Sequence, residues 1–288
     1  MHVPVMLGEA LDYLAIRPDG IYLDATTGLG GHTRAIAERL TTGFVIASDR
    51  DAESLQAAKD SLGELATRVR FHHGRFSEFQ AALDANGVSK VDGLLADLGV
   101  SRYQLTEPER GFSLMASGPI DMRMDRSQGE PAGDIVNFWA EKALADLIYQ
   151  LGEERRSRKI ARAIVRARPI HTTQHLARVI EEAVPRTTRL HPATQTFMAL
   201  RLAVNQEQEE LDSLLAIAPN IVASGGRIVV ITFMSLEDRK VKQGFQGLVR
   251  SGRAIMLTKH VVRPGEEEVR TNPPSRSAKL RAVELASS

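Results

Sequence analysis

The stretch Asp24-Ala-Thr-Thr-Gly28-Leu-Gly30-Gly31-His32 is the part of the sequence that most clearly indicates the fold. The apolar run Ile21-Tyr-Leu23 precedes it and predicts a strand, whereas residues 33–40 follow it with the pattern of a helix. A glycine-rich turn between a strand and a helix is typical of cofactor sites in α/β proteins. The sequence therefore predicts a nucleotide-cofactor site at this turn.

An acid stands at the distance that such a site requires. Asp49 lies twenty-one residues after Gly28, at the end of a second strand-like run over residues 44–48. The glycines let the backbone approach a ligand, the helix start offers free N–H groups, and the Asp49 carboxylate can accept hydrogen bonds from ribose hydroxyls. The alternative is a plain tight turn with Asp49 as a solvated charge, but the spacing favours a cofactor site.

Two residues distinguish this turn from the dinucleotide pattern. Gly-x-Gly-x-x-Gly would place a glycine at position 33, where the chain has Thr33. Asp24 ends the first predicted strand, and its carboxylate would repel a pyrophosphate but suit a cofactor with a cationic amino-acid end. The pattern therefore favours S-adenosylmethionine over NAD.

The composition is that of an ordinary soluble globular protein. Of the 288 residues, 43% are hydrophobic and 25% are charged. No apolar run approaches the roughly 20 residues of a membrane span, and the N-terminus lacks the regions of a signal peptide. Cysteine is absent, which excludes disulfides and thiolate metal sites, and no His, Asp or Glu cluster has metal-binding spacing. We expect a cytoplasmic protein with no membrane partner and no metal.

Strand-like and helix-like segments alternate up to about residue 100, with further strands predicted at 69–73 and 91–97. A loop rich in Gly, Pro, Met and Asp follows at about 105–130, and the periodicity from about 134 to 215 is purely helical. Strand character returns at residues 226–233, 254–257 and 278–284. We expect an α/β fold with a doubly wound, mostly parallel sheet. Residues 1–104 and 211–288 would form it, interrupted by an inserted all-helical domain over residues 105–210.

The insertion carries the strongest charge bias of the chain. Residues 155–205 contain eleven Arg or Lys and two acids, in a chain whose formal net charge is +1. Arg155, Lys159, Arg162 and Arg166 follow at spacings of four, three and four, which stacks them on one helix face. A solvated face is the alternative. Because polyanions are the commonest partner of such a stripe, we predict that it binds RNA.

Asp97 ends the predicted strand over residues 91–97. In open parallel sheets, ligands bind beyond the carboxyl ends of the strands, so Asp97 is expected to face the same crevice as the glycine turn and Asp49. Its carboxylate could hold the amino-acid end of the cofactor. It could also act catalytically, by accepting hydrogen bonds from an amine that is being methylated. A helix N-cap or a turn acid is the alternative.

These features together resemble one family, the RsmH/MraW-type methyltransferases of bacterial small-subunit ribosomal RNA. The shared segments run almost from end to end of the chain, and the stretch around Pro119-Ile-Asp-Met-Arg-Met124 is very specific. The other shared segments are His2-Val-Pro-Val5, Tyr22-Leu-Asp-Ala-Thr26, Gly30-Gly-His32, Ser48-Asp-Arg-Asp51, Asp97-Leu-Gly-Val-Ser101, Arg110-Gly-Phe-Ser113, Ile160-Ala-Arg-Ala-Ile-Val165, His191-Pro-Ala-Thr194, Ser235-Leu-Glu-Asp-Arg239 and Arg276-Ser-Ala-Lys-Leu-Arg281.

The resemblance implies a class I (Rossmann-like) methyltransferase that uses S-adenosylmethionine. Its substrate would be the exocyclic N4 amine of one cytidine in the decoding region of 16S rRNA, in the small ribosomal subunit. By motif match, the family's cofactor contacts fall on Gly30, Gly31, His32, Asp49, Phe76, Asp97 and Gln104. Phe76 and Gln104 rest on the resemblance alone. Whether the chain forms a homodimer stays open, as does the choice between naked RNA and the assembled subunit as substrate.

The chain departs from the family pattern at a few positions. Met234 stands where the family usually has His, Gln195 where it has Arg, and Arg102-Tyr103 where it has Ser-Pro. Near the C-terminus, Asn272-Pro-Pro274-Ser-Arg-Ser277 replaces Asn-Pro-Arg-Ala-Arg-Ser. These changes spare the cofactor turn, so they bear on the exact nucleotide more than on the chemistry.

Two other functions stay open at this point. A non-catalytic RNA-binding or ribosome-assembly factor could retain the methyltransferase fold, although the intact cofactor turn with Asp97 and Gln104 argues against it. A nicotinamide-dependent dehydrogenase is disfavoured by Asp24 and by the missing third glycine.

Overall fold

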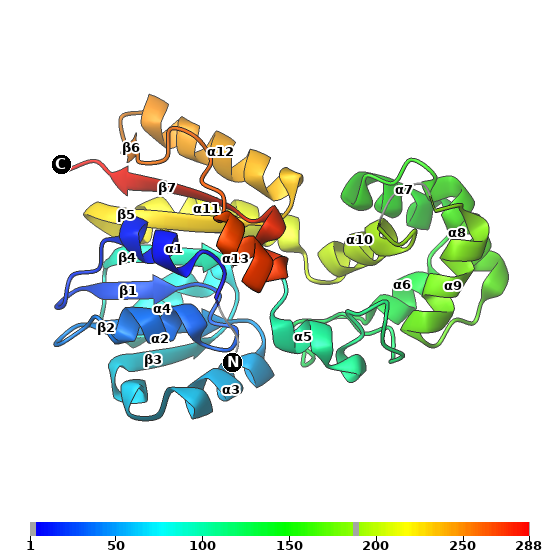
Figure 1. Ribbon diagram of the computed structural model, residues 1–288, viewed down its shortest axis with the longest axis horizontal. Coiled ribbons are helices and arrows are strands. Elements are labelled where there is room, and N and C mark those ends of the chain that lie inside the picture. The colour runs from blue at the N-terminus through cyan, green and yellow to red at the C-terminus, as the bar shows by residue number, and fades with distance from the viewer. Residues whose placement is uncertain (1–3, 187–189, 288) are drawn as a thin grey trace. The chain divides into compact units, whose positions relative to one another are not determined.

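The computed structural model describes residues 4–186 and 190–287, so His2 and Val3 of the first family-like segment lie outside the described residues. The chain divides into two compact units (Figure 1). Unit 1 comprises Met1–Gly99 and Gln208–Ser288, and unit 2 comprises Val100–Glu207. Both divisions lie a few residues before the boundaries expected after residues 104 and 210. Gln104 consequently belongs to unit 2.

In the described part of unit 1, seven strands form one sheet in the order β3-β2-β1-β4-β5-β7-β6. The strands from β3 to β5 pair in parallel, whereas β7 is antiparallel to both β5 and β6. The prediction of a doubly wound, mostly parallel sheet is confirmed. The strands are β1 (Ile21–Asp24), β2 (Phe44–Asp49), β3 (Val69–His73), β4 (Val91–Asp97), β5 (Val222–Thr232), β6 (Ala254–Met256) and β7 (Lys279–Leu285).

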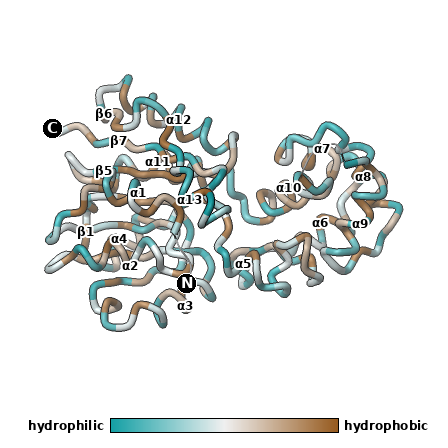
Figure 2. The backbone as a smooth tube through the Cα atoms, viewed as in Figure 1, coloured by the Kyte–Doolittle hydropathy of each residue, from teal (hydrophilic) through white to brown (hydrophobic). Residues whose placement is uncertain are grey.

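Helices cover both faces of this sheet because its strands are apolar on both sides. Along β5, which is hydrophobic for most of its length in Figure 2, Ile228 and Val230 pack with α4, α11 and α12. Val229 and Ile231 pack on the opposite face with α1 and α2. The helical segments of unit 1 are α1 (Leu7–Leu14), α2 (Gly31–Ala37), α3 (Ala52–Leu62), η1 (Gly63–Arg68), η2 (Phe76–Glu78), α4 (Phe79–Ala85), α11 (Glu207–Ile221, beginning at the boundary), α12 (Ser235–Arg250), α13 (Glu266–Thr271) and η4 (Pro273–Ser277).

Unit 2 is helical where the structure describes it, and it has a hydrophobic core of its own. The segment expected to be a loop at 105–130 is not wholly irregular, since its first residues are helical. Beyond it, the buried side of α8 includes Ile160 and Ile164, as the apolar spacing predicted. The helices are α5 (Arg102–Thr106), η3 (Pro108–Arg110), α6 (Ala132–Phe138), α7 (Glu141–Gly152), α8 (Ser157–Ala167), α9 (Thr173–Ala183) and α10 (Thr194–Val204).

Among the described residues, no helix combines the length and the apolar character needed to cross a membrane.

Candidate functional site

The glycine turn joins β1 to α2 in a conformation that suits glycine. Gly28 and Gly30 have φ angles of 50° and 83°, in the left-handed region. Space is also short, because a Cβ on Gly30 would lie 3.1 Å from the Ala58 Cβ, and a Cβ on Gly31 would collide with the Pro4 ring. Helix α2 begins at Gly31 and ends at Ala37, whereas the sequence predicted residues 33–40. Gly31 and His32 therefore form the first turn of the helix, where backbone N–H groups lack helical partners.

Asp24 stabilises this turn through hydrogen bonds. Its side chain is fully buried, and Oδ1 accepts a hydrogen bond from the Thr26 amide at 3.2 Å, while Oδ2 accepts one from the Thr33 hydroxyl at 2.6 Å. The two partners lie on either side of the glycines. Burial raises the pKa of Asp24 to about 6. The sequence predicted that the negative charge of Asp24 suits a cationic cofactor. The structure shows that its carboxylate also fastens the turn, through its bonds to Thr26 and Thr33.

Asp49, at the end of β2, is tied directly to the glycine turn. Its Oδ2 accepts a hydrogen bond from the Gly28 amide at 2.7 Å, and its Oδ1 accepts one from the Asp51 amide at 2.9 Å. Burial raises the pKa of Asp49 to about 6, against the lowering effect of these two bonds. A carboxylate has about four lone-pair positions, so Asp49 keeps acceptor capacity for two hydroxyl groups.

Phe76 lies close to Asp49 in the fold although the two are far apart in the sequence. The loop after β3 is joined to Asp49 by a hydrogen bond from the Gly74 amide to the Asp49 carbonyl, 3.0 Å long. Phe76 follows two residues later, half-buried, with its ring centroid 5.5 Å from that of Phe79. Its own amide donates to the Glu210 carboxylate at 3.0 Å. The ring is thus an apolar surface held against the core of unit 1, in the loop that is hydrogen-bonded to Asp49.

Asp97 ends β4, the strand next to β1, and its backbone amide donates to the Thr26 hydroxyl at 2.6 Å. Its Oδ1 is buried and has no hydrogen-bond partner. Burial, followed by the charges of Asp24, Glu237 and Glu268, raises the pKa of Asp97 well above its usual range. The N-cap of the next helix, α5, is Ser101, so the alternative of Asp97 as that N-cap is wrong. An unsatisfied buried acceptor of this kind is costly and calls for an explanation.

His32 approaches Asp97 from the first turn of α2. Its Nδ1 lies 3.9 Å from the Asp97 Oδ2, while its Nε2 lies 3.1 Å from the Val5 carbonyl oxygen. Since a carbonyl only accepts, Nε2 carries the hydrogen in this contact and Nδ1 faces the acid. The imidazole is almost fully buried, so these two contacts fix its orientation.

The residues assembled in unit 1 fit S-adenosylmethionine. Asp49 has lone pairs for ribose hydroxyls, Phe76 offers an apolar ring, and the start of α2 offers backbone donors. Asp97 offers an unpartnered carboxylate oxygen in a region made negative by Asp24 and Glu237, which suits a cationic amino-acid end. Glu237 lies in the family-like segment Ser235-Leu-Glu-Asp-Arg239, but its electrostatic effect on Asp97 was not predicted from the sequence. In the structure Met234 is the N-cap of α12, and Glu237 accepts from its amide at 3.2 Å.

Gln104, the remaining predicted cofactor contact, is buried in unit 2. Its side-chain Oε1 accepts a hydrogen bond from the Ser101 backbone amide at 2.9 Å, and its backbone amide donates one to the Ser101 hydroxyl at 3.2 Å. The two bonds form a capping box at the start of α5. These bonds give Gln104 a structural role, and its contact with the cofactor stays a prediction. The departures Arg102 and Tyr103 lie in the same short helix, while Gln195 lies in the first turn of α10 and Pro274 in η4.

The predicted basic stripe is largely a feature of α8. Lys159, Arg162 and Arg166 lie on that helix and are exposed, but Arg155 lies in the turn that precedes it, so its placement on the helix was wrong. The Arg162 Nε is 3.4 Å from the Glu141 Oε1 of α7, a partner that the local sequence did not show. Because both side chains are exposed, this pair screens the stripe only weakly.

Comparison with known proteins agrees with the geometry. A family model described as the MraW methylase family matches residues 1–286. The chain belongs to this family. It is 62% identical over 285 residues to the ribosomal RNA small subunit methyltransferase H of Solibacter usitatus, covering 99% of this chain and 100% of the relative. It is 50% identical to the enzyme of the same name from Acidobacterium capsulatum, covering 98% of each chain.

Among solved structures, the chain is similar to one described as an rRNA-methylase from Clostridium thermocellum, with a TM-score of 0.50 and 14% identity over 99% of this chain and 100% of the other. At that identity the likeness concerns the fold alone. Family and fold together confirm the prediction of a class I methyltransferase with S-adenosylmethionine as its cofactor. Which residues hold the cofactor stays a prediction.

Proposed function

We propose that the protein transfers a methyl group from S-adenosylmethionine to the exocyclic N4 amine of a cytidine in the decoding region of 16S rRNA. The names of the relatives support the substrate at the level of small-subunit ribosomal RNA. The N4 position and the decoding region follow from the family resemblance of the sequence motifs, Pro119-Ile-Asp-Met-Arg-Met124 above all.

The observation that carries the chemical proposal is the unpartnered Oδ1 of Asp97 at the carboxyl end of β4. The exocyclic amine of a cytosine is a poor nucleophile, because its lone pair is delocalised into the ring. An acceptor aimed at that NH2 group localises the lone pair and orients it for attack. Asp97 has one buried oxygen without a competing bond, as this task requires.

The raised pKa of Asp97 also suits the removal of a proton. S-adenosylmethionine, when bound, supplies an electrophilic methyl group carried on a positively charged sulfur. The attacked amine becomes cationic and must lose a proton, and the Asp97 Oδ1 would receive it. A carboxylate whose pKa lies well above the usual range is a better base than an exposed aspartate.

The other residues bind and orient. The Asp49 carboxylate would accept hydrogen bonds from the ribose hydroxyls, and Phe76 would pack against the base of the cofactor. The backbone amides of Gly30 and Gly31 would lie close to the cofactor. The exposed cations Lys159, Arg162 and Arg166 of α8, with Arg155 before it, would neutralise phosphates of the RNA.

The test is methylation by the purified protein of small-subunit particles from a bacterial strain that lacks this modification. Digested rRNA is analysed by mass spectrometry against standards of N4-methylcytidine and 5-methylcytidine, and primer extension locates the nucleotide. We expect N4-methylcytidine at one position of the decoding region. Methylation at carbon 5, or at another region, would contradict the assignment of the target.

A non-catalytic assembly factor predicts a different result. Such a protein would bind the particles and leave the nucleosides unchanged, even at saturating S-adenosylmethionine.

Titration with S-adenosylhomocysteine and NADH by calorimetry tests the dehydrogenase hypothesis, because we expect the first compound to bind and the second not to bind.

A further inference from the structure

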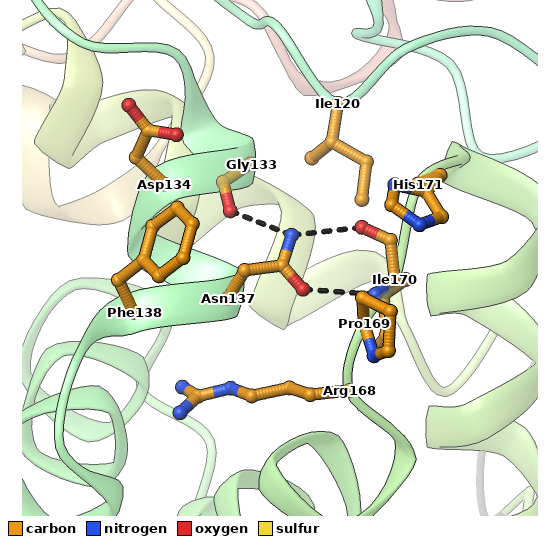
Figure 3. A pocket seen from close by; sticks show the side chains of 9 residues that line it. All are labelled: Ile120, Gly133, Asp134, Asn137, Phe138, Arg168, Pro169, Ile170 and His171. Carbon is orange, nitrogen blue, oxygen red and sulfur yellow. Dashed lines mark hydrogen bonds between the residues drawn. The ribbon is translucent and has the colours of Figure 1, made fainter.

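A cavity of about 500 Å³ opens in unit 2, and none of the site residues predicted from the sequence lines it. Its walls come mainly from α6, along its whole length, and from the segment that follows α8 (Figure 3). The volume falls within the range of small-ligand sites, about 300–1,000 Å³. The lining combines the buried apolar side chains Ile120 and Ile170 with Asp134, Phe138 and His171.

An aromatic ring stands at the mouth of this cavity in solvent. Phe138 is 78% exposed, and the next residue, Trp139, is 38% exposed, although large apolar side chains of this kind normally pack inside. Figure 3 shows the Phe138 ring between the side chains of Asp134 and Arg168. An exposed ring beside a cavity is suited to stacking against a flat ligand.

The rim that carries this ring is held by side-chain hydrogen bonds. Arg168 caps the end of α6, since its Nε donates to the Val136 carbonyl at 2.8 Å and its Nη2 to the Trp139 carbonyl at 2.7 Å. Asn137 joins the two walls, donating to the Ile170 carbonyl and accepting from the Ile170 amide, both at 2.8 Å (Figure 3). The ring is therefore presented on a fixed support, which lowers the entropy cost of binding.

The polar groups of the lining indicate a base rather than a phosphate. Asp134 makes no side-chain hydrogen bond among the described residues, its charge acts on Arg123 without a direct ion pair, and its carboxylate would repel an anion. It would accept a hydrogen bond from an exocyclic amine, while His171, which is exposed, can donate to a carbonyl oxygen. Cytosine, adenine and guanine carry such an amine, and uracil does not.

The charge around the cavity indicates that the base belongs to a nucleic acid. Helix α8 ends at Ala167, so its exposed cations Arg162 and Arg166 are followed closely in the chain by Arg168, which lines the cavity. Phosphates along such a helix would place the attached bases near the cavity mouth. An apolar protein segment would gain nothing from these cations.

We propose that this cavity binds one unstacked, amine-bearing nucleobase of the RNA substrate, stacked on Phe138 and distinct from the nucleotide that is methylated. The proposal rests on the proposed function in one respect, that the substrate is RNA.

The test uses the full chain and the oligoribonucleotides hexacytidylate and hexauridylate at one fixed salt concentration. Trp139 is the single tryptophan of the chain, so its fluorescence reports binding beside the cavity. We expect saturable quenching, tighter for hexacytidylate. Phe138→Ala should weaken binding of hexacytidylate about 5- to 150-fold, the range for one base stacked on an aromatic ring. Phe138→Tyr should retain binding, and Asp134→Ala should remove the preference for cytosine.

The matched control is Tyr149→Ala on α7, which removes another exposed aromatic ring outside the cavity lining and should leave binding unchanged. Binding of hexacytidylate by Phe138→Ala at wild-type strength overturns the proposal, as does Trp139 emission that stays constant at saturating RNA. Methylation of small-subunit particles is measured in parallel. An inactive wild-type protein would count against the proposed function, whereas an active wild type with an unaffected Phe138→Ala variant counts against the cavity alone.

Discussion

The substitution Asp97→Asn tests the chemical core of the site. It keeps the shape of the side chain and removes the negative charge and the proton-accepting oxygen. The wild-type Oδ1 has no partner in the protein, so the variant breaks no hydrogen bond of that oxygen, and we expect it to fold. If the oxygen accepts from the amine in the transition state, its loss costs about 1.5–3 kcal/mol, the range for hydrogen bonds to charged groups. The methyl-transfer rate should then fall about 10- to 150-fold.

The pH dependence gives a second, independent readout. Asp97 can take up a proton only when ionised, and the ionised form is also its stronger hydrogen-bond acceptor. Its pKa is raised well above the usual range for aspartate by burial and by neighbouring acids. The wild-type rate should therefore rise with pH as Asp97 loses its proton, and the Asp97→Asn rate should lose this step.

Single-turnover assays on small-subunit particles at saturating S-adenosylmethionine separate chemistry from cofactor binding. If Asp97 holds only the amino group of the cofactor, saturation should restore the rate of the variant. A normal rate with an unchanged pH profile under these conditions would eliminate the catalytic role.

Three other perturbations test the cofactor site, the basic stripe and the buried turn. Asp49→Ala should weaken S-adenosylhomocysteine binding by about 1.5–3 kcal/mol if the carboxylate accepts two ribose hydroxyls; unchanged affinity by calorimetry in a folded variant removes Asp49 from the site. Reversal of Lys159 and Arg162 to Glu should weaken RNA binding across sequences and flatten its salt dependence by about 0.7–0.9 in slope for each phosphate that is no longer neutralised. Its matched control is reversal of the exposed α12 cations Lys242 and Arg250, and equal RNA affinity in the two double variants would reduce the stripe to a solvated face. Asp24 has a folded-state pKa of about 6 against an ordinary 3.8, so it favours the folded state at low pH, and this contribution is lost as pH rises through 6. Asp24→Asn should therefore gain about 2.5 kcal/mol relative to the wild type between pH 4 and pH 8 in urea unfolding; parallel stability curves for the two proteins would contradict the burial argument.

The sheet could be predicted from the sequence because its strands are short apolar runs bounded by turn residues. All seven strands lie where the pattern placed them, although β5 begins at Val222, earlier than the predicted residue 226. Val222 pairs with Val91 of β4, but the small or polar residues 223–226 that follow it separate this pair from the regular pairing that begins at Arg227, which hides the start of β5 from a hydrophobicity pattern. The helix ends were less predictable, because Gly31 starts α2 despite a low helix propensity.

The site could be predicted only where local spacing carried the information. The contact between Asp49 and Gly28 follows from the strand-turn-helix-strand layout. The role of Asp24 could not be read in the same way, since the sequence gives its position and charge but not its burial or its bond to Thr33. The contributions of Glu237 and Glu268 to the pKa of Asp97 come from segments more than a hundred residues away, which only the tertiary fold brings close.

The three aspartates of the site lower the stability of the folded state. Asp24, Asp49 and Asp97 all have raised pKa values because the sheet and its helices remove water from their carboxylates. A buried acid that is charged at neutral pH destabilises the folded state, and apolar residues at these positions would stabilise it. The Thr33 hydroxyl and the Gly28 amide offset part of this cost for Asp24 and Asp49, whereas the Asp97 Oδ1 has no such compensation. Under the proposed function, a cationic cofactor and a cationic amine in the transition state would supply it, because each would stabilise a negative charge that the protein alone leaves unpaired. We propose that the same acids that weaken the fold also favour a cationic cofactor over a dinucleotide.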